Sequence, residues 1–76
     1  MAYRMVEVFA TNITNIKEAK AFEGFIMKRF PTYRVNFDLE DCDHILRIEN
    51  QMEIDSSIVE EIAHAMNIHI KVLEDI

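Results

Sequence analysis

The residues with the strongest potential for chemistry in this sequence are Cys42 and His44, which are separated by one position. A thiolate and an imidazole both bind Zn²⁺ or Cu⁺, and Asp41 or Asp43 can add a carboxylate oxygen. A structural zinc site needs four ligands, and the sequence has no second pair at a recognisable spacing. The pair therefore predicts a weak Zn or Cu site, or one completed by a second chain. The alternative is structural, with Cys42 in a half-buried turn position and His44 beginning a strand.

Other titratable residues give weaker indications of a site. Glu40, Asp41 and Asp43 together can attract a hard cation, but they lack the alternating ligands and the glycine of a calcium loop, which favours a solvated acidic turn. His64 falls off the inner face of its predicted helix and is expected to be solvated. His69 is expected on the open face of an edge strand, where it can contact a partner.

The motifs of common catalytic and phosphate-binding sites are missing from the sequence. Gly24 is the only glycine, whereas a loop that cradles phosphate needs several. No nucleophile–base pair is recognisable, and a domain of this size has little room for a pocket. We therefore expect no enzyme activity and no cofactor beyond the metal ion considered above.

The elements that must position these residues follow from the hydrophobic pattern. Alternating hydrophobicity predicts four strands, and apolar residues spaced three or four positions apart predict two helices. The strands are residues 3–10, 33–39, 44–49 and 68–73. The first helix is residues 16–30, and the second begins after a cap at Asp55, Ser56 or Ser57 and ends at Met66. This order predicts one ferredoxin-like β-α-β-β-α-β domain over residues 1–76, of the α+β class. Its four-stranded antiparallel sheet has the order 4-1-3-2, with both helices on one face.

Local signals mark the ends of both predicted helices. Asn15 is a favourable N-cap, and Glu18 three positions later has the spacing of a capping box. Pro31 ends the first helix, and Asn67 can close the second in the left-handed conformation. Gly24 interrupts the first helix, which we interpret as a sign of close packing against the sheet.

The stretch between the first strand and first helix, Thr11-Asn12-Ile13-Thr14-Asn15, is where a family resemblance becomes visible. In element order and length, nearly the whole chain resembles a heavy-metal-associated domain, the small copper- and zinc-chaperone type of ferredoxin-like fold. That family carries a metal-binding C-x-x-C in this stretch, where Asn12 and Asn15 stand at the two cysteine positions. Amide oxygens are poor ligands for soft metals, so the resemblance implies the fold without the metal site. The segment 36–49 is also similar to a hairpin of short, uncharacterised bacterial proteins of this type.

The face of the predicted sheet away from the helices is a candidate interface. On the first strand, Val6, Val8 and Ala10 make a wholly apolar face, which we expect to point toward the helices. The open face is then predicted to display Met5, Phe9, Ile45, His69 and Leu73. Contiguous exposed apolar residues indicate a partner, so we expect a homodimer or a protein partner at this face.

Composition limits the classes of partner and location. Half of the 76 residues are apolar, which is typical of a globular domain. Fourteen acidic residues against eight basic ones give a formal charge of −6, which argues against binding to nucleic acid or to anionic membranes. The single cysteine cannot form an internal disulfide, and the N-terminal residues lack the pattern of a signal peptide. We expect a cytoplasmic protein.

Two functional hypotheses follow from these observations. The first is a non-enzymatic module for protein interaction or self-association, built like a metal-chaperone domain without its thiolate site. The second is weak transition-metal binding through Cys42 and His44.

Overall fold

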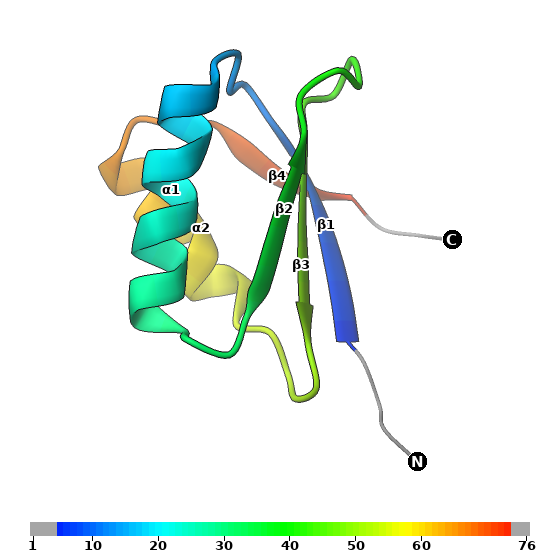
Figure 1. The fold of residues 1–76 in the computed structure, drawn as a ribbon, viewed down its shortest axis with the longest axis vertical. Helices are drawn as coiled ribbons and strands as arrows, with labels where there is room; N and C mark the ends of the chain where they lie inside the picture. The colour runs from blue at the N-terminus through cyan, green and yellow to red at the C-terminus, as the bar shows by residue number, and fades with distance from the viewer. Residues whose placement is uncertain (1–4, 74–76) are drawn as a thin grey trace.

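The computed structural model describes residues 5–73 and shows an antiparallel sheet with two helices packed on one side (Figure 1). Its elements are β1 (Met5–Thr11), α1 (Ile16–Arg29), β2 (Arg34–Asp38), β3 (Ile45–Asn50), α2 (Ser56–Ala65) and β4 (Ile70–Leu73). The strand order β2-β3-β1-β4 is the predicted order 4-1-3-2 taken from the opposite edge. The ferredoxin-like α+β fold is thus confirmed. Residues 3 and 4 of the first predicted strand lie outside the described part of the chain.

Side-chain caps fix the ends of the helices. Asn15 accepts a hydrogen bond of 2.8 Å from the backbone N–H of Glu18, as the capping pattern predicts. Asp55 caps α2, and the hydroxyl of Ser57 donates to its carboxylate over 2.7 Å, which holds the pKa of Asp55 below its usual value. Asn67 has a φ of 59° and so takes the left-handed conformation expected after α2.

The hydrophobic core fills the space between the sheet and the helices. Its buried members are Phe9, Ile13, Ala19, Phe22, Ile26, Tyr33, Leu46, Ile48, Val59, Ala63 and Ile68. Tyr33 brings a polar atom to this core, and its hydroxyl accepts a hydrogen bond of 2.8 Å from the backbone N–H of Asp55. This bond ties the start of β2 to the start of α2 and leaves the phenolic oxygen satisfied.

The two faces of β1 are the reverse of the prediction. Phe9 lies opposite Leu46 on β3 and Val72 on β4, and all three side chains project toward the helices. Phe9 is fully buried there, and Met5 is on the same side of the strand at its exposed end. The open face of β1 carries Val6, Val8 and Ala10. The expected placement of Met5 and Phe9 on the open face is therefore wrong, because a phenylalanine ring buries more apolar area under the helices than a valine does.

The apolar residues of α1 also occupy more than one face. Phe22 and Ile26 are fully buried, but Ile16 and Phe25 are 63% and 55% exposed. Each residue turns the helix by about 100°, so Phe25 lies about 60° around the axis from Phe22 and about 100° from Ile26. The helical spacing of the apolar residues predicts that Ile16 and Phe25 share one inner stripe with Phe22 and Ile26, and this prediction is wrong.

Gly24 does not mark a close approach between α1 and the sheet. A Cβ atom placed at this position would have no neighbouring heavy atom within 4 Å. Gly24 is exposed, so the predicted close packing of this residue is wrong.

Candidate interaction surfaces and metal ligands

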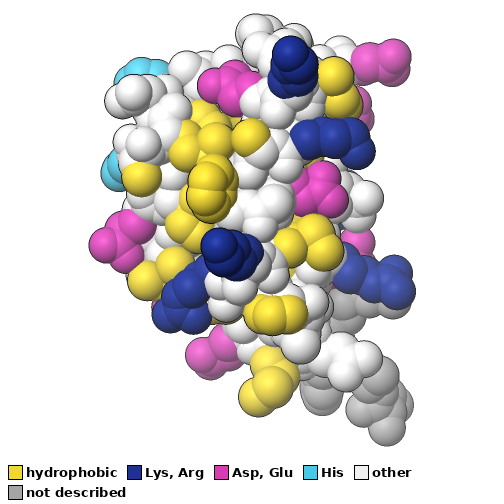
Figure 2. Space-filling view, turned by 60° about the vertical axis from the view of Figure 1, so that its left-hand side comes forward, with side chains coloured by type: hydrophobic (Ala, Val, Ile, Leu, Met, Phe, Trp, Pro, Cys, Tyr) yellow, Lys and Arg dark blue, Asp and Glu magenta, His cyan; other side chains and the backbone are white. Residues whose placement is uncertain are grey.

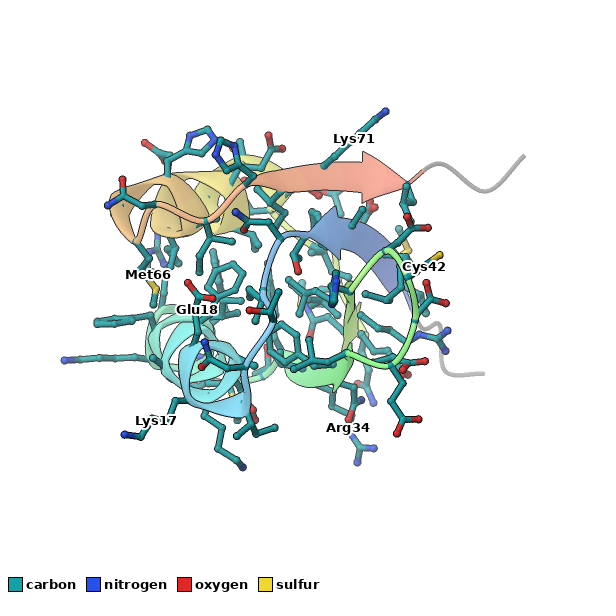
Figure 3. All side chains as sticks on the ribbon, turned by 90° about the horizontal axis from the view of Figure 1, so that it is seen from above. Lys17, Glu18, Arg34, Cys42, Met66 and Lys71 are labelled. Atoms are coloured by element: carbon teal, nitrogen blue, oxygen red, sulfur yellow. The ribbon has the colours of Figure 1, made fainter. Side chains whose placement is uncertain are left out.

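The turn between β2 and β3 brings together the side chains of Asp41, Cys42 and Asp43. One ligand atom from each residue lies within 4.8 Å of the others, and all three residues are exposed. The backbone N–H of Asp43 donates to the carboxylate of Asp41 over 2.9 Å, which shapes the turn. His44 does not belong to this group, so the structure does not join the predicted pair Cys42 and His44 as neighbouring ligands. Cys42 lies at the outer edge of this loop (Figure 3).

His44 holds the turn against the end of β1. Its φ of 47° is in the left-handed region, and its backbone N–H donates to the carbonyl of Asp41 over 2.9 Å. The hydroxyl of Thr11 donates to the His44 carbonyl over 2.7 Å. Nδ1 of the ring is buried and has no hydrogen-bond partner among the described residues, while the strand itself begins at Ile45. These contacts give the backbone of His44 a structural role.

The loop between β1 and α1 is held in place by hydrogen bonds of its two asparagine side chains. The side-chain oxygen of Asn12 accepts from the backbone N–H of His69 over 3.0 Å, and the N–H of Asn12 donates to the His69 carbonyl over 3.2 Å. The side-chain oxygen of Asn15 is engaged as the cap of α1. Both amides thus fix the loop, and the residues present do not fit a thiolate-type metal site. The exposed His69 side chain lies just before β4.

The open face of the sheet has a narrow apolar strip along β1. Val8 pairs with Leu73, and Ala10 pairs with Ile45, so these apolar side chains are neighbours across the strands. Val6 is 48% exposed at one end of the strip. Charged residues on the flanking strands are Arg34, Asp38, Arg47, Glu49 and Lys71. Ile45 and Leu73 lie on this face as expected, but the strip lacks an aromatic residue.

A larger apolar surface lies on the outer side of the molecule, between α1 and α2. The groove has a volume of about 700 Å³ and is lined on the α2 side by Ile58, Ile62 and Met66. Phe25 of α1 forms the opposite wall. Figure 2, in which the helices come forward, shows hydrophobic side chains gathered on this face beside Lys and Arg side chains. Met66 is seen at the junction of the two helices in Figure 3.

Charged side chains border this α1–α2 groove on both walls. Lys28 and Arg29 come from the last turn of α1, and Glu61 comes from α2. The guanidinium of Arg29 lies 4.8 Å from the centre of the Phe30 ring, which orients that side chain at the end of the helix. His64 of α2 is exposed, in agreement with the prediction that it is solvated.

The likeness of this chain to known proteins does not assign it a function. Within residues 5–73, no helix is both long enough and apolar enough to cross a membrane. Comparison of the chain with models of protein families, with curated proteins and with solved structures finds no match.

Proposed function

We propose that this domain is a non-enzymatic self-association module. The observation that carries the proposal is the α1–α2 groove, where Phe25 is 55% exposed beside apolar side chains of α2. A contiguous apolar surface of this kind is typical of a protein-binding site. A domain of 76 residues also buries a limited share of its chain, so association adds stability that its own core does not supply.

The proposed module is built like a heavy-metal-associated domain that lacks its metal-binding thiolates. The β-α-β-β-α-β order supports this relationship, as does the position of Asn12 and Asn15 in the first loop. Because both amides hold the loop in place, the segment has a structural use that is compatible with the loss of a metal. On this proposal, the domain does not bind metal at the loop between β1 and α1, and it acts instead through self-association at the outer surface of the helices.

Sedimentation velocity from low micromolar to near-millimolar concentration tests the self-association directly. We expect the sedimentation coefficient to rise with concentration from that of a monomer to that of a dimer. The apolar contact should persist in high salt, because salt screens charges and does not weaken apolar burial. A strict monomer throughout this range would contradict the proposal.

A second candidate function is weak transition-metal binding at the β2–β3 turn. The specific observation is the closeness of the Asp41, Cys42 and Asp43 ligand atoms, all within 4.8 Å of one another. One thiolate and two carboxylates suit Zn²⁺ better than Mg²⁺, which prefers oxygen ligands alone. The three side chains provide fewer than the four ligands of a structural zinc site, so water or a second chain would complete the set.

Calorimetric titration with Zn²⁺ and with Cu⁺ tests this second candidate. We expect the native chain to bind Zn²⁺ weakly, and we expect Cys42→Ser to lose most of the affinity because the hydroxyl is a poor ligand. His44→Ala reports whether the histidine contributes, since its ring is outside the group. Equal binding by the native chain and Cys42→Ser would contradict a site at this turn.

A further inference from the structure

We propose that the α1–α2 groove joins two copies of this chain in a symmetric dimer whose two-fold axis runs along the groove. This inference rests on the proposed self-association. It adds the surface at which the two copies contact each other and their relative orientation. In a two-fold dimer each copy presents the same surface, so every contact occurs twice. The groove must therefore be complementary to itself.

The charges of the two helices provide this self-complementarity. On the walls of the groove, α1 contributes Lys28 and Arg29, whereas α2 contributes Glu61 and neither Lys nor Arg. A half-turn about an axis along the groove places α1 of one copy over α2 of the other, so walls of opposite charge meet. An axis across the groove would instead place α1 over α1 and bring like charges together. The charge pattern therefore selects the first orientation.

The positions of the charged residues along the helices agree with this orientation. α1 and α2 run in opposite directions (Figure 1), so the last turn of α1 lies beside the first half of α2. Lys28 and Arg29 line the same groove as Glu61, which lies near the middle of α2, so the three charges are close in level along the helices. Rotation about an axis parallel to the helices preserves this level. The cations of one copy thus come opposite Glu61 of the other.

The apolar residues of the groove supply the affinity of this dimer. Phe25 projects from α1 with 55% of its surface exposed, and the same rotation places it over α2 of the second copy. There it can cover Ile58 and Ile62, which are only partly buried in one chain. Aromatic residues at the centre of an interface carry much of its binding energy, and the surrounding charges set the orientation.

The open sheet face is the competing surface, and its features favour it less. Among the residues described on this face, Val6 is the most exposed large apolar side chain, and the neighbouring strands present charges of both signs. The charges of the open sheet face therefore do not favour one orientation of a two-fold dimer over another. The groove combines a larger apolar wall with charges that are separated by helix.

Reversal of the charges tests the orientation. One variant combines Lys28→Glu with Arg29→Glu, and the other is Glu61→Lys. Each variant alone should have a dimer dissociation constant about tenfold higher than the native chain, because attraction becomes repulsion at both symmetric contacts. An equimolar mixture of the two variants should recover the native dissociation constant, since each reversed wall then meets its complement.

Matched controls separate this effect from overall charge. Glu60→Lys changes the formal charge of −6 by the same two units as Glu61→Lys, but Glu60 does not line the groove. Lys17→Glu with Lys20→Glu is the corresponding control on α1, because neither lysine lines the groove. Both controls should associate as the native chain does. Overall repulsion would make Glu61→Lys associate more tightly, which is the opposite of the expected result.

The outcomes distinguish this dimer from the proposed function itself. Failure of the mixture to associate better than either variant alone would overturn the symmetric groove dimer. A dimer that resists both groove variants but dissociates in Val8→Lys would place the interface on the open sheet, leaving self-association intact. Circular dichroism checks that each variant folds, and if the double reversal unfolds, Lys28→Glu alone is mixed with Glu61→Lys.

Discussion

Replacement of Phe9 with alanine is expected to lower the free energy of unfolding by about 3–5 kcal/mol, the range for truncation of a buried aromatic residue. Phe9 is fully buried between β1 and the helices, where it lies opposite Leu46 and Val72. Truncation removes the apolar contacts of the ring and leaves a cavity that the surrounding residues fill only in part. Urea unfolding followed by circular dichroism measures the change.

The neighbouring Val8→Ala variant is the matched control for Phe9→Ala. Val8 projects to the open face, where truncation should lower the free energy of unfolding by less than about 1.5 kcal/mol. If Phe9→Ala is too unstable to fold, Phe9→Leu retains part of the apolar contact and keeps the comparison measurable. A larger loss for Val8→Ala than for Phe9→Ala would mean that the two faces of β1 are reversed.

This reversal of faces shows which part of the fold the sequence determines by pattern alone. On β3, Leu46 and Ile48 alternate with the charged residue Arg47, which predicts that Leu46 and Ile48 face the core, and both are fully buried. On β1, both alternating sets contain apolar residues, and alternation does not select between them. Size and pairing decide instead, because Phe9 faces the core residues of the two neighbouring strands.

The α1–α2 groove and the ligand group at Cys42 could be predicted from the sequence only in part, for a related reason. The apolar residues of α1 include Ile16, Phe25 and Met27 in addition to the buried ones, which is more than one stripe facing the core can hold. That excess was the available signal for an outer apolar surface. The α1–α2 groove itself depends on how the two helices are rotated against each other, which no local pattern specifies. The grouping of Cys42 with both neighbouring aspartates likewise depends on the turn that the Asp41 carboxylate stabilises.

The two phenylalanines of α1 are expected to respond differently to truncation, and this difference tests the rotation of the helix. Phe22→Ala should lower the free energy of unfolding by about 3–5 kcal/mol. Phe22 is fully buried, and the centre of its ring lies 6.3 Å from that of Phe37. Phe25→Ala should change the free energy of unfolding by less than about 1 kcal/mol, because 55% of Phe25 is already exposed to water. Urea unfolding of both variants at a concentration where the chain is monomeric provides the comparison.

Self-association should show the reverse dependence on these two positions. Phe25→Ala removes the aromatic wall of the groove and should weaken the dimer while the fold remains intact. Phe22→Leu keeps the core largely filled and, because Phe22 does not line the groove, should associate as the native chain does. Equal losses of stability for Phe22→Ala and Phe25→Ala would place both rings in the core and remove the groove as a binding surface. A Phe25→Ala variant that folds normally but stays monomeric would instead support the groove as the interface. The Phe25 ring would then stabilise the contact between two chains and not the fold of one chain.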